Sequence, residues 1–163
     1  MTAFRLERTV PAAPSAVWRR VTDWRAHAAL IPLTSVVPAG PRPPDTVVGS
    51  VFVVRTGIGR AGFDDPMEIV EWSPPGACGV GRCRLEKRGR TIRGWAVIEV
   101  RPAGSGSVVV WTEEARVRGV PRRLAALEAR VGRAVFGRAL DALLRSVGSG
   151  ASGVSGVSGP DTP

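Results

Sequence analysis

The sequence predicts an α+β protein in which a long C-terminal helix covers a curved antiparallel sheet of about seven strands. Two observations lead to this fold class. Segments rich in β-branched residues follow one another from Ser50 to Val117, and the short turns between them favour antiparallel pairing. The segment from Pro121 to Val147 has helical periodicity and is the only one long enough to cover the apolar face of such a sheet.

Length and composition indicate a single globular domain. The chain has 163 residues, of which 44% are hydrophobic and 23% are charged, and this length suffices for a sizeable core. No apolar run reaches the roughly 18–20 residues of a membrane span, and the N-terminus lacks the apolar region of a signal peptide. We therefore expect a cytoplasmic protein without a membrane span.

The sequence contains no recognisable metal-binding or phosphate-binding motif. Cys78 and Cys83 lie in what reads as one strand, at an odd spacing that puts their side chains on opposite faces, so a disulfide is not expected. There is one histidine and no CxxC pair, which argues against a zinc site. A Gly-rich phosphate loop, a nucleophile elbow and a catalytic triad order are also missing. We expect neither a metal nor a cofactor.

The net charge of +9 and an isoelectric point near 11.5 raise the question of a nucleic-acid partner. Nearly all the basic residues are arginines scattered along the chain, and Lys87 is the single lysine. This arginine-rich composition is what a GC-rich genome gives without selection for a partner. The chain also has no tyrosine and no interleaved aromatic and basic motif of an RNA-binding sheet. We therefore interpret the charge as a solvated surface and expect no nucleic-acid partner.

The first part of the chain predicts a strand and two short helices. Residues 4–12 begin with alternating apolar and charged side chains, which is typical of a half-buried strand. Pro14 fits the first turn of a helix that extends to Trp24. A second short helix ends before Pro32, because the residue that precedes a proline disfavours the helical conformation. Residues 38–49 are rich in Pro and Gly and predict a loop.

The middle of the chain predicts successive strands. They are expected at 50–59, 67–72, 77–89, 90–107 and 108–117, the fourth of them ending in a flexible loop. The segment 57–66 is expected to be a loop. Its two acids, Asp64 and Asp65, are interpreted as capping backbone amides ahead of Pro66, because no third ligand for a metal is visible.

The C-terminal helix carries two apolar stripes, which predicts that it is both the lid of the sheet and the wall of a cavity. The first stripe comprises Leu124, Leu127, Val131 and Val135, and the second comprises Phe136, Leu140, Leu143 and Val147. Gly132 lies at the changeover, where the missing side chain leaves room. The Gly/Ser-rich tail, 148–163, is expected to be disordered, so the folded domain is expected to span 1–147.

Four segments occur in a recognisable order: APSAVWRRVTDW near the start, MEIVEWSPP, the hairpin RGWAVIEVRPAGSGSVVVWTEEA, and FGRALDALLRSV at the end of the last helix. Together they make the chain resemble the SRPBCC superfamily, which includes START, Bet v 1-like and bacterial polyketide cyclase/dehydrase proteins. The resemblance implies a helix-grip fold, in which the curved sheet grips the last helix around a deep apolar cavity. It does not imply catalysis, because many members only bind lipids, hormones or polyketides.

The expected partner is a small hydrophobic molecule, polyketide- or lipid-like, held in the cavity between the sheet and the C-terminal helix. The residues expected to bind it are Trp24, Met67, Ile69, Gly132, Phe136, Leu140 and Leu143. The alternative function is that of a polyketide cyclase, aromatase or dehydratase that uses one or two polar residues of the cavity.

Three residues, His27, Glu71 and Glu113, are candidates for proton transfer in that alternative. His27 is the only histidine and lies on the second short helix, which the resemblance places near the cavity mouth. Glu71 lies in the cavity if the strand face that carries Met67 and Ile69 is the inner one. Otherwise it is solvated.

Glu113 is expected to face the cavity, because it shares its side of the last strand with Val109, Trp111 and Ala115. A buried glutamate needs a partner, for which Arg84 is one candidate. A structural ion pair is therefore the alternative to a catalytic role for Glu113.

Overall fold

The computed structural model describes residues 3–31, 33–38, 46–58 and 61–148. The strands are β1 (Ala3–Val10), β2 (Thr34–Pro38), β3 (Val51–Ile58), β4 (Ala61–Ser73), β5 (Gly81–Arg88), β6 (Ile92–Ala103) and β7 (Gly106–Val117). The helices are α1 (Pro14–Val21), α2 (Trp24–Leu30) and α3 (Ala125–Gly148), and a single 3₁₀ turn, η1 (Arg122–Leu124), precedes α3.

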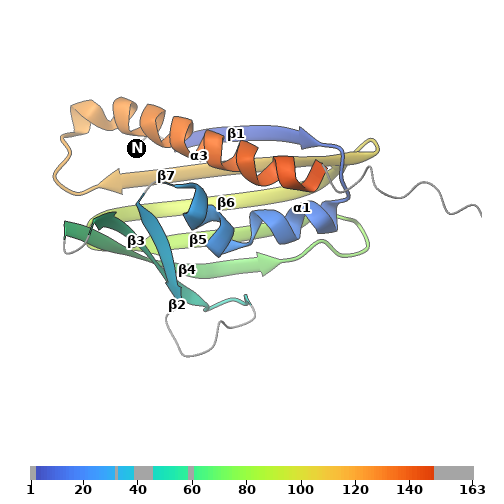
Figure 1. Ribbon diagram of the computed structural model, residues 1–163, viewed down its shortest axis with the longest axis horizontal. Coiled ribbons are helices and arrows are strands. Elements are labelled where there is room, and N and C mark those ends of the chain that lie inside the picture. The colour runs from blue at the N-terminus through green and yellow to red at the C-terminus, as the bar shows by residue number, and fades with distance from the viewer. Residues whose placement is uncertain (1–2, 32, 39–45, 59–60, 149–163) are drawn as a thin grey trace, which may run out of the picture.

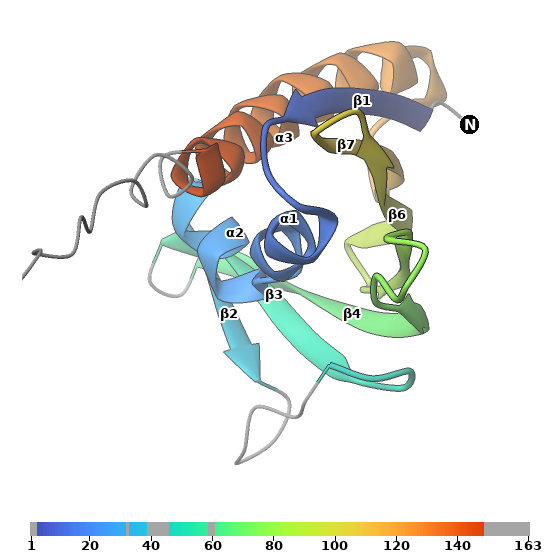
Figure 2. The same ribbon diagram turned by 90° about the vertical axis from the view of Figure 1, so that its right-hand side faces the viewer.

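The seven strands form one sheet in the order β1-β7-β6-β5-β4-β3-β2, and every neighbouring pair is antiparallel. Figure 1 shows α3 lying along this sheet. Figure 2, turned by 90°, shows the sheet curling around α1 and α2, with α3 across the open side. The predicted fold class, a curved seven-stranded sheet that grips a long C-terminal helix, is confirmed.

Two local features help this sheet to curl. The register between β4 and β5 shifts between Ile69 and Glu71, and such a bulge bends its strand and increases the local twist. Gly94 on β6 has a φ of +149°, and a side chain there would overlap the carbonyl oxygen of Glu114. Only glycine therefore allows β6 and β7 to approach as they do at this point.

The two short helices fill the inside of the curve. Pro14 begins α1, and Val17 and Val21 are completely buried one turn apart, which is the amphipathic spacing of a helix packed on a sheet. The Asp23 carboxylate accepts a hydrogen bond from the Ala26 amide at 3.0 Å and so caps α2. Trp24 consequently begins the second helix, whereas the sequence placed it at the end of the first.

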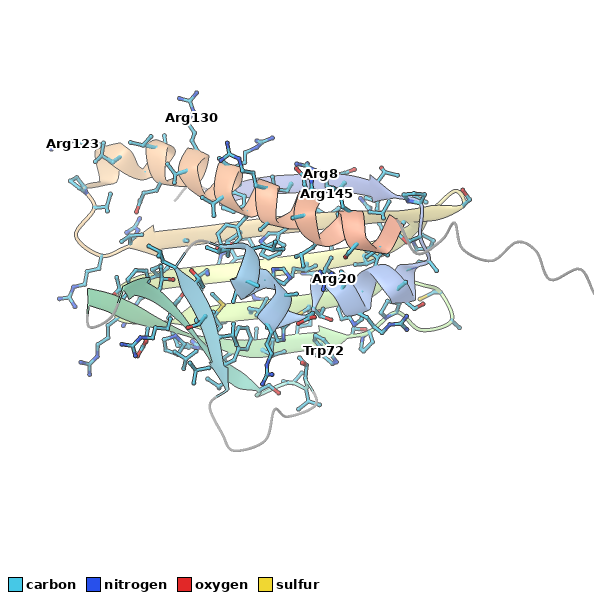
Figure 3. The ribbon with its side chains drawn as sticks, in the orientation of Figure 1. Arg8, Arg20, Trp72, Arg123, Arg130 and Arg145 are labelled. Carbon is cyan, nitrogen blue, oxygen red and sulfur yellow. The ribbon has the colours of Figure 1, made fainter. Side chains whose placement is uncertain are left out.

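The two ends of α3 differ in their contact with the sheet. Leu140 and Leu143 are completely buried, whereas Leu127 and Val131 are each 55% exposed. In the C-terminal half of the helix, Asp141 pairs with Arg8 of β1 at 2.6 Å. Near the N-terminal end, Figure 3 shows Arg130 pointing away from the sheet. The second predicted stripe is therefore a packing surface, and the first is only partly covered.

Several details of the sequence prediction are wrong. The segment 57–66 is not a loop throughout, because β4 begins at Ala61 and includes both aspartates. α3 starts at Ala125 and not at Pro121, because the 3₁₀ turn intervenes. Cys78 precedes β5 and does not lie in one strand with Cys83, although both cysteines are free, as the sequence predicted. Of the predicted tail, Gly148 is the last residue of α3, and 149–163 lie outside the described residues. Within the described part of the chain, no helix is long and apolar enough to cross a membrane.

Candidate functional site

A small cavity, called here the inner cavity, lies between the sheet and the helices and has a volume of about 70 Å³. Its wall is mostly apolar, and α2, β3, β7 and α3 contribute aromatic rings to it: Trp24, His27, Phe52, Trp111 and Phe136. The rings pack on one another, with 5.2 Å between the centroids of Trp24 and Phe52 and 5.5 Å between those of Trp111 and Phe136. Lys87 and Glu113 are charged members of the wall.

A second hollow, called here the outer groove, lies under the N-terminal half of α3 and has a volume of about 350 Å³. Apolar residues of β1, β6, β7 and α3 line it, including Phe4, Ile92, Val117, Leu127 and Val131. Phe136 and Glu113 line both hollows. These two side chains therefore form the partition between the inner cavity and the outer groove.

Three buried charged residues meet at this partition. The Lys87 ammonium lies 3.2 Å from Glu113 Oε1 and 3.6 Å from Asp65 Oδ2, and none of the three side chains is more than 4% exposed. They come from three strands, β4, β5 and β7. Lys87 stands opposite Gly94 of the intervening β6, which has no side chain to obstruct its path toward β7. The glycine thus permits an ion pair that spans a strand.

Hydrogen bonds satisfy this cluster only in part. The Trp111 indole N–H donates to Glu113 Oε2 at 3.0 Å. Among the described residues, Glu113 Oε1 and Asp65 Oδ1 have no hydrogen-bond partner. Glu113 Oε1 has Lys87 only as an ion-pair partner. Burial raises the pKa of Asp65 and the neighbouring Lys87 partly offsets this. The cluster therefore retains unused acceptor capacity.

His27 is buried and neutral at physiological pH. Its Nε2 donates to the Val21 carbonyl oxygen at 2.7 Å, and its ring lies 5.2 Å from that of Trp111. Burial lowers its pKa from 6.5 to about 4, although the hydrogen bond to Val21 opposes the shift. A histidine with this pKa is a poor general base near pH 7, which weakens the catalytic role considered for it.

The structure brings only some of the predicted site residues together. Trp24, Met67 and Phe136 line the inner cavity, and Gly132 lines the outer groove. Ile69, Leu140 and Leu143 are buried and line neither hollow. They pack the interior instead.

Of the two glutamate candidates, Glu113 faces inward with 1% exposure, as the alternation of β7 predicts. Its ionic partner is Lys87 and not Arg84, which pairs with Glu86. Glu71 lies on the outer side of β4. Its side chain is 41% exposed, and its Oε1 lies 2.9 Å from Arg82 Nε. The bulge after Ile69 reverses the alternation there, so that Trp72 turns inward onto Trp18 and Glu71 turns outward.

Two residues of the cluster, Lys87 and Asp65, were missed as site residues although the sequence contains a signal for each. On β5, Lys87 occupies the same face as Cys83 and Leu85, while Arg or Glu residues fill the other face. Asp65 occupies the same face of β4 as Met67, but assigning 57–66 to a loop concealed that periodicity. A single lysine on the apolar face of a strand is the recognisable sign.

No group of three or more His, Cys, Asp or Glu side chains that could hold a metal ion occurs among the residues the structure describes. The polar part of the site consists of the ion-paired cluster, the His27 ring, the Thr34 hydroxyl and the indole N–H groups of two tryptophans. This set can bind and orient hydrogen-bonding groups of a small molecule, and Glu113 can accept a proton.

Comparisons with known proteins agree on one architecture. A family model described as polyketide cyclase/dehydrase and lipid transport matches residues 1–148. A search of curated proteins finds no match. Three solved structures have the same fold.

A protein from Thermus thermophilus is 18% identical, with a TM-score of 0.64 over 93% of this chain and 99% of that one. The ZhuI aromatase/cyclase of Streptomyces sp. R1128 is 17% identical, with a TM-score of 0.64 over 96% and 99% of the two chains. Norcoclaurine synthase of Thalictrum flavum is 18% identical, with a TM-score of 0.62 over 93% and 96%.

Proposed function

Because the chain belongs to the polyketide cyclase/dehydrase and lipid transport family, we propose that it binds a small hydrophobic molecule, polyketide- or lipid-like, between its sheet and α3. The observation that carries the proposal is the pair of adjoining hollows with a shared partition. Ligand sites are typically concave and apolar with a few placed polar groups. The inner cavity alone is smaller than the roughly 300–1,000 Å³ of such sites, so the ligand also occupies the outer groove. A cytoplasmic location is part of the same proposal.

Two alanines on neighbouring strands allow a matched test of this location. Ala96 lines the inner cavity and Ala115 lines the outer groove. Ala134 lies on α3 but borders a different surface hollow. We expect Ala96→Leu and Ala115→Leu to weaken binding of the fluorescent probe N-phenyl-1-naphthylamine about tenfold or more, since each fills space that the probe needs. Ala134→Leu should bind the probe like the wild type.

The measurement is a fluorescence titration, with circular dichroism to verify that each variant is folded. Folded Ala96→Leu and Ala115→Leu proteins with unchanged affinity would place the ligand elsewhere. Native mass spectrometry of the protein purified from its own host then identifies any molecule that is retained. Displacement of the naphthylamine probe by that molecule would show that both occupy one site.

A second candidate function is cyclisation or dehydration of a polyketide-like substrate. The observation that favours it is the Lys87–Glu113 pair, buried at 3.2 Å on the cavity wall. In such a reaction Glu113 accepts a proton from the carbon beside a substrate carbonyl, and Lys87 donates a hydrogen bond to the enolate oxygen that forms. The enolate carbon then attacks a second carbonyl of the same substrate molecule, and the proton on Glu113 passes to the resulting alkoxide.

A simple ketone tests this chemistry apart from the natural substrate. If Glu113 takes the proton, the protein should accelerate hydrogen–deuterium exchange at the methyl group of acetophenone in D₂O, followed by NMR. Glu113→Gln should lose at least about 99% of the acceleration, because general bases typically contribute 10²–10⁴-fold. An exchange rate unaffected by the wild-type protein would remove this candidate and leave ligand binding standing.

A further inference from the structure

The buried cluster at the partition contains more acidic than basic side chains. It combines two carboxylates, Asp65 and Glu113, with one ammonium, Lys87, and the three side chains are 4%, 1% and 4% exposed. Within the described residues, no other cation pairs with either carboxylate. Buried charge that is not balanced is costly. The site therefore favours partners that add positive charge or donate hydrogen bonds, and disfavours further negative charge.

One acceptor atom of this cluster lacks a hydrogen bond. Glu113 Oε1 is buried and has no hydrogen-bond partner among the described residues, although the Lys87 ammonium lies 3.2 Å away, while Oε2 is already bonded to the Trp111 indole. Glu113 lines both hollows, so a ligand in either one can reach it. The Trp24 indole nitrogen, on the wall of the inner cavity, also lacks a hydrogen-bond partner among the described residues. Unused hydrogen-bonding capacity thus occurs on the wall of the proposed binding site.

We propose that the ligand carries a hydrogen-bond donor, a hydroxyl or a protonated amine, that binds Glu113 at the partition, and that an otherwise identical molecule with a carboxylate in this position is rejected. This inference rests on the proposed ligand-binding function and specifies the class of molecule bound. A donor satisfies the free acceptor of Glu113. A ligand carboxylate leaves that acceptor unsatisfied and adds a negative charge beside two acidic side chains that share a single ammonium.

The preference holds for either charge state of Asp65. Burial raises the pKa of Asp65. If Asp65 is protonated, the cluster is neutral and a ligand carboxylate gives it a net charge of −1. If Asp65 is ionised, the carboxylate gives a net charge of −2. A donor adds no negative charge in either case.

The outer surface of the molecule favours anions, whereas the partition disfavours them. Binding at the two places can therefore be distinguished. The chain carries a net charge of +9, and at one end of the sheet Arg90, Arg93, Arg116 and Arg118 border one surface hollow. Long-range attraction therefore favours anions. If a carboxylate ligand binds more weakly than an alcohol despite this long-range attraction, groups within the site are the cause of the difference.

The test uses four probes with one apolar body: 1-ethylnaphthalene, 2-(1-naphthyl)ethanol, 2-(1-naphthyl)ethylamine and 1-naphthylacetate. Isothermal titration calorimetry at pH 7 measures the affinity of each for the full chain. We expect the alcohol and the amine to bind at least about tenfold more tightly than the carboxylate, the usual scale of a charge-assisted hydrogen bond. An amine that binds more tightly than the alcohol identifies charge, in addition to hydrogen bonding, as the basis of selection.

Two glutamate variants assign the preference to this site. Glu113→Gln keeps the shape of the side chain and an oxygen for the Trp111 indole but removes the charge. It should reduce the ratio of amine to carboxylate affinity at least about tenfold. Glu71→Gln makes the same chemical change on the outer face, where Glu71 pairs with Arg82, and should leave the ratio unchanged. Titrations at two salt concentrations identify any carboxylate bound to the exposed arginines, because such binding weakens as salt is added.

Three outcomes would overturn the inference. If 1-ethylnaphthalene binds but the carboxylate binds as tightly as the alcohol, the donor requirement is wrong and ligand binding stands. If Glu71→Gln and Glu113→Gln change the ratio equally, the selection does not arise at the partition. If none of the four probes binds, both the inference and the proposed function fail.

Discussion

The two halves of α3 have similar apolar stripes but lie over different surroundings. Beneath residues 136–148 the stripe is packed, and Leu140 and Leu143 are inaccessible to solvent. Beneath residues 125–135 the stripe borders the outer groove, and Leu127 and Val131 remain 55% exposed. Phe136, at the junction, packs on Trp111 on one side and on Phe4 on the other.

The difference shows that one amphipathic helix can pack against the core with one half and border an open hollow with the other. Figures 1 and 2 show α1 beside the C-terminal half of α3, and Arg8 of β1 pairs there with Asp141. The N-terminal half extends over strands β6 and β7, where the hollow remains. The following predictions test this division, beginning with the largest expected effect.

Truncating a leucine in each half should separate the two roles most clearly. Leu140→Ala removes a fully buried side chain and should lower the free energy of unfolding by about 2–5 kcal/mol. Leu127→Ala removes a side chain that is mostly accessible and should change it by no more than about 0.5 kcal/mol. Urea unfolding followed by circular dichroism measures both values. Equal losses would mean that both halves of the helix serve the core.

Lowering the pH should reduce the free energy of unfolding, because the buried His27 ring then becomes protonated. Its pKa is about 4 in the folded protein, against 6.5 as the ordinary value, so the unfolded state binds a proton more readily. The stability that depends on neutral His27 is complete above about pH 6.5 and is lost as the pH falls toward 4, by up to about 3 kcal/mol. Urea unfolding across this range measures the loss, and His27→Gln should reduce it. An identical pH profile for the variant would exclude His27 as the cause.

Truncating Phe136 should make affinity depend more strongly on ligand length. Phe136→Ala should widen the passage between the inner cavity and the outer groove, so that more added methylenes can be buried, each worth about 0.8 kcal/mol. We expect the affinity of 1-hexylnaphthalene relative to 1-ethylnaphthalene to rise at least about tenfold in Phe136→Ala, by calorimetry. Val131→Ala, which alters only the groove wall, is the control. A ratio unchanged in Phe136→Ala would show that Phe136 does not limit the passage between the two hollows.

The two glycines of α3 provide the smallest contrast. A methyl group at Gly137 would find neighbours at 3.8 Å, whereas one at Gly132 would meet the Phe4 ring at 3.0 Å. Gly137→Ala should therefore stabilise the protein by up to about 1 kcal/mol through helix propensity. Gly132→Ala should gain less, or lose stability, because Phe4 has to move. Thermal unfolding of the pair measures the difference, and a larger gain at Gly132 would contradict the close contact with Phe4.

The sequence predicted the architecture well because periodicity reports local structure and the order of elements is characteristic. It also predicted that Glu113 faces inward, from the apolar residues that share its strand face. It left the side of Glu71 open, because the bulge that reverses the alternation leaves no clear trace in the residue pattern. It also did not separate Leu140 and Leu143, which are buried and line neither hollow, from Phe136, because a helical stripe does not distinguish residues that pack from residues that border a hollow. That distinction depends on how far the sheet curls toward each end of α3.

The indole N–H signals of the five tryptophans test the location of the ligand most directly. Trp24 and Trp111 line the inner cavity, whereas Trp18 and Trp72 pack on each other and Trp95 lies beneath Arg84. In a ¹⁵N NMR titration with 2-(1-naphthyl)ethanol, we expect the Trp24 and Trp111 signals to shift with one binding constant and the other three to stay in place. Shifts confined to Trp95, or no shift at Trp111, would contradict a ligand site at the partition.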